Sequence, residues 1–312
     1  MGKLLRAPFV YAGGKSRVAD VVWAHLGSPR HYIEPFCGSA AVLLARPQPI
    51  LASHAETLND LDGMVVNAWR AIKHSPEDVV RWMLAPVSTI ELYARRKYLV
   101  ERANTLRALL EDDVDYHDAR AAGYWLYCAN VGLGKPLGCV RTNDVGEIVS
   151  WYASRVTPSL THVNNGIVSQ SHEMALEWLK ALGERFARVR ILCSDWSRLM
   201  NANWLDRLHP TGVFFDPPYD VEHYEDVYAI KTPGVARAVR EWCIAHGDDP
   251  NFRIVLAGYY EEHEELLSHG WRVHRWVGST TWNGRGRRQV DRFREALFIS
   301  PHCAHSSLFP DL

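Results

Sequence analysis

Short apolar segments with the character of β-strands alternate with helical segments in the first and last parts of this 312-residue chain. HYIEPF (31–36) precedes GSAAVLLAR (38–46), a helical pattern that starts on a glycine and small residues. Further along, FRIVLAGY (252–259) precedes the helical pattern EEHEELLSHG, which ends on Gly270. Strands that alternate with helices predict a largely parallel sheet with helices on both faces. The expected fold class is therefore α/β.

The middle of the chain interrupts this alternation. SPEDVVRWML begins with an N-cap serine, a proline and acidic first-turn residues, and STIELYARRKYLVERANTLRALLEDD is a long amphipathic stretch. NVGLGKPLGCVRTNDVGEIVSWY (130–152) is rich in glycine and β-favouring residues, which predicts a loop with a hairpin. We therefore expect three segments: a first core part at 1–74, an inserted, mainly helical subdomain at 75–165, and a second core part at 166–312.

Composition excludes several classes of protein. Hydrophobic residues make up 47% and charged residues 23%, which is typical of a soluble protein with a sizeable core. The formal net charge is -1, so any nucleic-acid contact requires a local basic face. The six cysteines form no CxxC pair and no metal-type cluster with histidine, which favours reduced thiols in the cytoplasm and no metal. We found no signal-peptide pattern and no apolar run approaching the ~18 residues of a membrane helix.

The stretch TGVFFDPPYDVEHY (211–224) is a candidate catalytic site. Its apolar run ends at Asp216, and two prolines then stop the strand and fix the backbone. A carboxylate at the C-terminal end of a sheet strand lies where open α/β sheets bind ligands. Asp216 and the Pro217 carbonyl can accept hydrogen bonds from an exocyclic amine while Tyr219 stacks on the attached ring. The arrangement suits a planar, amine-bearing ring.

Three further stretches carry residues suited to a cofactor. In IEPFCGSAA (33–41), Gly38 stands at a strand-to-helix turn where a cofactor can approach the backbone, although only one of the three glycines of a dinucleotide fingerprint is present. In LNDLD (58–62), Asp60 is placed to bind ribose hydroxyls; capping of the next helix is the alternative for this acidic group. In VYAGGKSRVAD (10–20), Lys15 can pair with a ligand carboxylate, and a plain surface loop is the alternative.

In their order and spacing, these stretches resemble the Dam-like, D12-class DNA adenine-N6 methyltransferases of the alpha group. YAGGK resembles that family's W-A-G-G-K start with a tyrosine for the tryptophan, and EPFCGSA resembles its methyl-donor loop. LNDLDGMVVNAWRAI resembles its acidic segment with the following helix, CSDW (193–196) its S-D-F/W segment, and DPPY its catalytic motif. The resemblance implies a Rossmann-like, S-adenosylmethionine-dependent methyltransferase sheet, with the inserted 75–165 subdomain recognising the target.

The resemblance implies S-adenosylmethionine as cofactor and a residue set for each role. Hydrogen bonds from adenine N6 to Asp216 and to the Pro217 carbonyl would direct the nitrogen lone pair at the methyl group, so that positioning and electrostatics do the catalytic work. A base within a duplex must flip out to reach such a site. The implied catalytic residues are Asp216, Pro217, Pro218 and Tyr219. The implied cofactor-binding residues are Tyr11, Gly14, Lys15, Glu34, Phe36, Gly38, Ser39, Asp60, Asp195, Trp196 and Asp216.

Two arginine-containing stretches are candidates for contact with double-stranded DNA. Arg141 and Asn143 match the family's R-x-N segment, and arginine is the residue that most often contacts a guanine edge. The surrounding family elements are poorly kept, so the target sequence can differ from GATC. NGRGRRQVDRFR (283–294) carries five arginines against one aspartate. Its candidate phosphate contacts are Arg285, Arg287 and Arg288, and a solvated hairpin tip is the alternative.

The sequence therefore predicts a site-specific DNA N6-adenine methyltransferase. We expect a monomer that acts on double-stranded DNA in a prokaryotic cytoplasm or a phage-infected host. An N4-cytosine or RNA-adenine methyltransferase is an alternative within the same chemistry, because each presents an exocyclic amine. A catalytically silent DNA-binding relative is the alternative from another class. Phage-borne, restriction-linked and solitary enzymes share these motifs, so the sequence does not choose among those roles.

Overall fold

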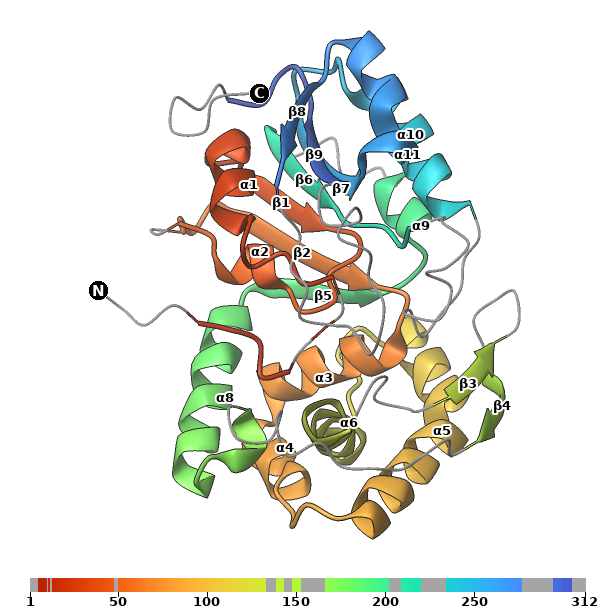
Figure 1. The fold of residues 1–312 in the computed structure, drawn as a ribbon. Coiled ribbons are helices and arrows are strands. Elements are labelled where there is room, and N and C mark those ends of the chain that lie inside the picture. The colour runs from red at the N-terminus through yellow and green to blue at the C-terminus, as the bar shows by residue number, and fades with distance from the viewer. Residues whose placement is uncertain are drawn as a thin grey trace. The chain divides into compact units, whose positions relative to one another are not determined.

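The computed structural model describes residues 5–9, 11, 13–47, 50–132, 139–142, 148–152, 166–201, 209–219, 234–276 and 294–304 (Figure 1). The chain divides into two compact units. We call the first the helical unit; it comprises Met1–Gly14, Asn59–Asp195 and Ala229–Lys231. We call the second the sheet unit; it comprises Lys15–Leu58, Trp196–Tyr228 and Thr232–Leu312.

A seven-stranded sheet has the strand order β5-β2-β1-β6-β7-β9-β8. Strand β1 pairs in parallel with both β2 and β6, and β6 pairs in parallel with β7, whereas β9 is antiparallel to β7 and to β8. The strands are β1 (His31–Glu34), β2 (Ala55–Asp60), β5 (Val189–Cys193), β6 (Thr211–Phe215), β7 (Phe252–Tyr259), β8 (Arg272–Arg275) and β9 (Glu295–Ile299). The predicted α/β class with a largely parallel sheet is confirmed.

Strands β1 and β6 lie at the point where the strand order reverses. The chain runs outward from β1 through β2 to β5 and then returns to the other side of β1 as β6. In the β1–β6 register Ile33 is opposite Val213, so Glu34 and Asp216 follow at the same edge of the sheet. Open α/β sheets bind ligands at this edge, where the strand order reverses. The topology therefore brings together the ends of the two strands that carry EPFCGSA and DPPY.

In the sheet unit, helices pack on the central strands. Helix α1 contacts β6 and β7, and α10 also contacts β7; Figure 1 shows α1 and α10 on opposite sides of these strands. Strand β6 is buried along its whole length, which explains its uninterrupted apolar sequence, because a parallel strand covered on both faces has no side open to water. The helices of this unit are α1 (Ala19–Leu26), α2 (Ala41–Leu44), α9 (Trp196–Met200), α10 (Val235–His246), α11 (Tyr260–His263) and the 3-10 helix η3 (Glu264–His269).

Two helices of the sheet unit differ from the prediction. The pattern at 38–46 forms only the short α2, because the residues before it turn the backbone through left-handed conformations at Gly38 and Ala40. The pattern EEHEELLSHG gives one turn of α-helix and then the 3-10 helix η3, which ends at Gly270 with a φ of 77°. The predicted glycine end of this segment is confirmed.

The helical unit is built around α3 and α6. Helix α6 contacts α3, α4 and α5, while α8 contacts α3 and α4. Strand β5 also belongs to this unit, where α3, α5 and α8 contact it. The helices are α3 (Gly63–His74), α4 (Pro76–Met83), α5 (Thr89–Asp112), α6 (Ala119–Val131), the 3-10 helix η1 (Ile167–Ser169) and α8 (His172–Phe186). The segment boundaries expected at 75 and 165, and the target-recognition role of that segment, stay predictions.

Local sequence accounts for several helix starts in this unit. The side chains of Ser88, Asp118 and Ser171 accept hydrogen bonds from backbone N–H groups in the first turns of α5, α6 and α8. Ser75 is the N-cap residue of α4, as predicted, but its hydroxyl lies 2.9 Å from His117 Nε2 and makes no cap bond. The predicted hairpin forms from β3 (Cys139–Thr142) and β4 (Ile148–Tyr152).

One buried arginine connects three parts of the helical unit. The Nε atom of Arg70, on α3, donates to the Ile191 carbonyl of β5 at 2.9 Å. Its Nη1 atom donates to the carbonyl of Leu110 in α5 and to those of Asp113 and Tyr116, which follow α5. The side chain is 1% exposed. The bond to Leu110 satisfies a carbonyl that the end of α5 leaves without a helical partner.

Candidate active site

The donor loop, residues 35–40, connects β1 to α2 through a tight turn. The backbone N–H of Ala40 donates to the Cys37 carbonyl at 2.6 Å. Gly38 has a φ of 43° and Ala40 a φ of 50°, so both adopt the left-handed conformation. Such a conformation costs nothing steric at glycine but about 1 kcal/mol or more at alanine. This loop contains Phe36, Gly38 and Ser39, and Phe36 and Ser39 are half-buried.

Glu34 is hydrogen-bonded to the two elements that flank the donor loop, β1 and α2. Its Oε1 atom accepts hydrogen bonds from the Tyr32 hydroxyl at 2.7 Å and from the Leu43 N–H at 2.6 Å. The residue is 2% exposed, and burial raises the pKa of its carboxyl to about 8. The two hydrogen bonds lower this pKa, whereas the neighbouring charges of Asp216 and Glu56 raise it further. Glu34 thus stabilises the loop from within the sheet unit, and its predicted contact with a cofactor stays a prediction.

Asp216 directly follows β6 and is paired with Lys15. The Lys15 Nζ atom lies 2.7 Å from Oδ1 and 2.9 Å from Oδ2 of the carboxylate. The side chains of Lys15 and Asp216 are 5% and 21% exposed. Burial raises the pKa of Asp216, whereas the charge and hydrogen bond of Lys15 lower it and Glu295 raises it. The lysine of YAGGK and the aspartate of DPPY therefore form one charged pair at the edge of the sheet.

Tyr219 stacks on a second tyrosine. Its ring lies 4.3 Å from the ring of Tyr259, centroid to centroid, with an interplanar angle of 14°. Tyr259 is the last residue of β7 and is fully buried, while Tyr219 is 8% exposed. The Lys15 ammonium lies 5.9 Å from the centroid of the Tyr219 ring. Between Asp216 and Tyr219, Pro217 is buried and Pro218 is half-buried.

An aromatic cluster joins the donor loop to the CSDW segment. Phe36 lies 6.2 Å from Trp196 and 6.4 Å from Phe215, ring centroid to ring centroid. Trp196 in turn meets Phe215 edge-on at 6.0 Å. The structure thus brings together two residues predicted to bind cofactor, Phe36 and Trp196, on the buried end of β6.

The remaining predicted cofactor residues belong to the helical unit. The Asp60 side chain accepts a hydrogen bond from the Asp62 N–H, and Asp62 caps α3 by accepting from the Met64 N–H, both at 2.9 Å. The capping alternative is therefore confirmed for Asp62, and the ribose contact of Asp60 stays a prediction. Two hydrogen bonds, from Asn59 Nδ2 to the Ser194 carbonyl and from the Ser194 N–H to the Asp60 carbonyl, connect the ends of β2 and β5. Asp195 comes directly after them in the chain.

At the start of the chain, Tyr11 and Gly14 form a turn in which the Gly14 N–H donates to the Tyr11 carbonyl at 3.2 Å. Gly14 is exposed and Tyr11 is half-buried, with its ring 6.4 Å from that of Phe9. The contacts of these two residues with a cofactor stay predictions.

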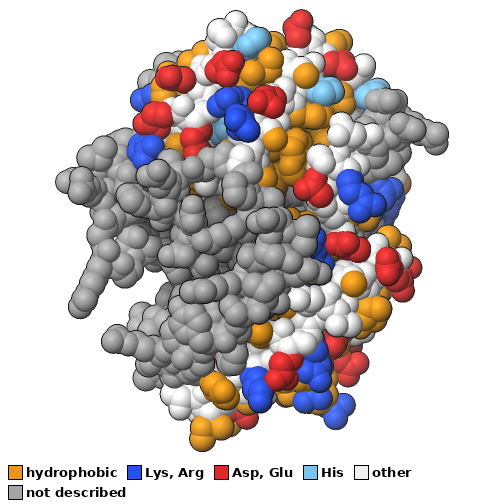
Figure 2. All heavy atoms as spheres, turned by 90° about the vertical axis from the view of Figure 1, so that its right-hand side faces the viewer, with side chains coloured by type: hydrophobic (Ala, Val, Ile, Leu, Met, Phe, Trp, Pro, Cys, Tyr) orange, Lys and Arg blue, Asp and Glu red, His pale blue; other side chains and the backbone are white. Residues whose placement is uncertain are grey.

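The predicted DNA-contacting side chains are not placed by the structure. The backbone of Arg141 lies in β3, opposite Ser150 of β4. The side chain of Arg141 lies outside the described residues, as do Asn143, Arg285, Arg287 and Arg288. On the face shown in Figure 2, the described Lys and Arg side chains lie among Asp and Glu side chains. In the described part of the chain, no helix is both long and apolar enough to cross a membrane, and no group of three or more His, Cys, Asp or Glu side chains is arranged to hold a metal ion.

Sequence reasoning missed two residues of this site, Tyr32 and Tyr259. Each contacts a predicted residue, since Tyr32 bonds to Glu34 and Tyr259 stacks on Tyr219. A signal for Tyr259 was present, because it ends the strand FRIVLAGY, and neighbouring parallel strands end at one edge of a sheet. For Tyr32 the signal was its position two residues before Glu34, because residues two apart in a strand have their side chains on the same face.

Comparison with known proteins agrees with the geometry. The family model of D12 class N6 adenine-specific DNA methyltransferases matches residues 11–233. The DNA N-6-adenine-methyltransferase of Escherichia phage P1 is 24% identical over 219 residues, which are 69% of this chain and 24% of that protein. The chain thus spans about a quarter of the curated relative that it matches. Because the family match covers well over half of the chain and contains YAGGK, EPFCGSA and DPPY, the chain belongs to the D12 class N6 adenine-specific DNA methyltransferase family.

Proposed function

We propose that this chain transfers a methyl group from S-adenosylmethionine to the N6 amine of adenine in double-stranded DNA. The observation that carries the proposal is the position of Asp216, which emerges from β6 beside the donor loop and is followed by Pro217, Pro218 and Tyr219. A carboxylate, a backbone carbonyl fixed by proline and an aromatic ring are the groups that a planar ring with an exocyclic amine requires. The family membership of the chain supports adenine as that ring.

The residues near the donor loop have the chemistry to hold this cofactor. The half-buried Phe36 ring offers an apolar surface for an adenine ring, and the buried rings of Trp196 and Phe215 pack against it. Glu34 stabilises the loop on which Phe36 and Gly38 lie. In the helical unit, the half-buried Asp60 carboxylate is the proposed acceptor for ribose hydroxyls. When bound, the cofactor supplies an electrophilic methyl group on a sulfonium centre.

Asp216 and the Pro217 carbonyl accept the two N–H bonds of the adenine amine. Lone-pair delocalisation into the ring makes this nitrogen a poor nucleophile, and the two acceptors direct the lone pair towards the methyl group. A carboxylate offers about four lone-pair positions, so Asp216 can accept from the amine while it keeps a bond to Lys15. No strong base is required, because the methylated nitrogen would be acidic and would release one of its protons to the solvent. Catalysis is then mainly positioning and electrostatics.

Lys15 favours the ionised form of Asp216, which is the form that accepts hydrogen bonds. Burial by itself favours the protonated carboxyl, which would donate a hydrogen bond. The ammonium group 2.7 Å away opposes that effect. Tyr219 offers a ring on which an adenine flipped out of the duplex can stack. Recognition of the target sequence is assigned to the 75–165 segment and phosphate contact to the arginines of 283–294, in a protein that acts as a monomer. The phage relative supports a role in a bacterial or phage-infected cell.

Methyl transfer to DNA tests the proposal directly. The protein is incubated with tritium-labelled S-adenosylmethionine and DNA that contains all short sequence contexts, and the product nucleosides are separated. N6-methyladenine is the expected product, and sequencing-based mapping of modified bases then gives the recognition site. N4-methylcytosine, or incorporation of label only when RNA replaces the DNA, would favour the corresponding alternative. Binding of DNA without any incorporation of label would favour the catalytically silent relative.

A further inference from the structure

The ring of Tyr219 has a fixed support on one side. Tyr219 lies in the segment that follows β6, and Tyr259 ends β7, the parallel neighbour of β6. The two rings are nearly parallel, with centroids 4.3 Å apart. Tyr259 is fully buried, and its backbone lies opposite Glu295 of β9, so close packing restrains the Tyr259 ring. One face of Tyr219 is therefore occupied by protein.

A charged side chain adds to this support. The guanidinium carbon of Arg294 lies over the Tyr259 ring, 4.5 Å from its centroid. The Nε atom of Arg294 lies 3.3 Å from Glu261 Oε2, and its backbone carbonyl accepts from the Tyr260 N–H at 2.8 Å. A cation over a ring face is attracted by the quadrupole of the ring. Arg294 thus contributes to fixing the plane of Tyr259, and through the stack the plane of Tyr219.

We propose that Tyr259 is a positioning residue that leaves Tyr219 only one face for the target base and sets the plane in which that base lies. This inference rests on the proposed function, because it concerns a base that stacks on Tyr219. The plane matters for transfer because the N6 amine lies in the plane of the adenine ring. A tilt of Tyr219 would tilt the amine away from the Asp216 acceptor. Misplacement of a reacting group by about 1 Å can slow a reaction strongly.

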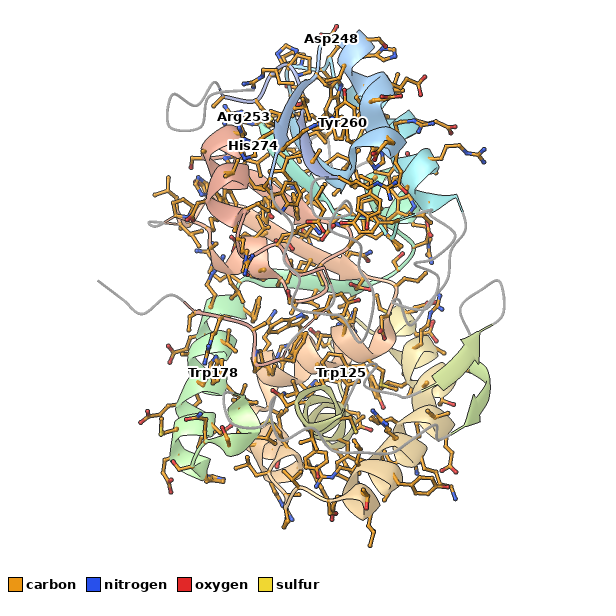
Figure 3. The ribbon with its side chains drawn as sticks, viewed as in Figure 1. Trp125, Trp178, Asp248, Arg253, Tyr260 and His274 are labelled. Atoms are coloured by element: carbon orange, nitrogen blue, oxygen red, sulfur yellow. The ribbon has the colours of Figure 1, made fainter. Side chains whose placement is uncertain are left out.

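Substitution of Tyr259 separates this role from simple packing. Tyr259→Leu removes the stacking ring, Tyr259→Phe keeps it, and Tyr260→Leu is the matched control. Tyr260, labelled in Figure 3, is the next residue and contacts Arg275 and Phe298. We expect Tyr259→Leu to lower kcat about two- to tenfold, the range that an aromatic pair contributes. Tyr259→Phe and Tyr260→Leu should keep the kcat of the unchanged protein.

Fluorescence reports the stacking itself. A duplex carries 2-aminopurine at the target position found by mapping, and its emission is measured with each variant at saturating protein. Stacking on a tyrosine ring quenches a flipped 2-aminopurine, so Tyr259→Leu should give brighter emission than the unchanged protein, Tyr259→Phe or Tyr260→Leu. Thermal melting followed by circular dichroism shows that each variant is folded. Tyr259→Met is a second non-planar replacement that fills more of the space if the leucine variant does not fold.

The outcomes separate the inference from the proposed function. If the unchanged protein methylates no DNA, the proposed function fails. If it methylates DNA but a folded Tyr259→Leu or Tyr259→Met variant keeps both kcat and the quenched emission, the inference alone is overturned. Loss of the quench in Tyr259→Phe would overturn it as well, because that variant keeps the ring.

Discussion

Lys15 and Asp216 form an ion pair, with the ammonium nitrogen 2.7 Å from Oδ1 and 2.9 Å from Oδ2, although 201 positions separate them in the chain. The pair joins the YAGGK motif to the DPPY motif. Both side chains are largely removed from water, so their attraction is screened less than that of a surface pair. Lys15 thus acts on the protonation of the proposed catalytic carboxylate, whatever contact it makes with a cofactor.

Removing this ammonium group should shift the pH dependence of methyl transfer. In the proposed function Asp216 must be ionised to accept the amine hydrogens, so we expect activity to fall as the pH falls through its pKa. Burial raises that pKa and Lys15 lowers it. In Lys15→Met the pKa of Asp216 therefore rises further, and the acid limb of kcat/KM moves to higher pH. A pH–rate profile between about pH 5 and 9 measures the shift. The exposed Lys97→Met is the control, and equal acid limbs in both variants would contradict the assignment.

Replacing the carboxylate itself should abolish most of the activity and leave the other implied cofactor residues unchanged. Asp216→Asn keeps the shape of the side chain but loses its charge and one acceptor. We expect kcat to fall by about 100- to 1000-fold, as when another preorganised electrostatic group is removed. Calorimetric titration should still detect S-adenosylmethionine binding. The exposed Asp248, labelled in Figure 3, supplies the control Asp248→Asn. Full activity in Asp216→Asn would refute its catalytic role.

Glu34 should make the protein less stable as the pH rises. Its pKa in the folded protein is about 8, above the ordinary 4.5, so the folded state binds its proton more tightly than the unfolded state does. The stabilisation from that proton is complete below about pH 4.5 and is lost as the pH rises to about 8. Glu34→Gln stays neutral and can still accept from Tyr32 and Leu43. Urea unfolding at several pH values should show a flatter dependence for this variant. An unchanged dependence would show that Glu34 is not protonated at neutral pH.

Loss of the Arg70 guanidinium should destabilise the helical unit. Arg70→Met fills most of the volume but leaves four carbonyls without their donor, those of Ile191, Leu110, Asp113 and Tyr116. We expect the free energy of unfolding to fall by about 2–4 kcal/mol, since unsatisfied buried groups cost roughly 1–3 kcal/mol each and partial rehydration offsets part of the loss. Denaturant unfolding measures the change. The exposed Arg102→Met should change stability by less than about 0.5 kcal/mol, and a similarly small effect at Arg70 would contradict the prediction.

Much of the local structure was predictable because it depends on neighbours in the chain. The apolar run before Asp216 forms a strand that the prolines end. Serine and aspartate caps begin α5, α6 and α8, as local rules require, although the cap predicted at Ser75 makes no cap bond. The order of the motifs was sufficient to predict the family. The local rules fail at α2, where the left-handed residues Gly38 and Ala40 shorten a helix whose apolar pattern begins earlier.

The pairs that build the site depend on the order of the strands, which no local pattern contains. Lys15 meets Asp216, and Tyr259 meets Tyr219, at the edge where β6 ends beside its parallel neighbours β1 and β7. The sequence predicted which carboxylates and rings follow the end of a strand, but it did not predict which residue each of them contacts. That choice follows from how the whole sheet buries its apolar faces, because only the complete packing decides which strands become neighbours.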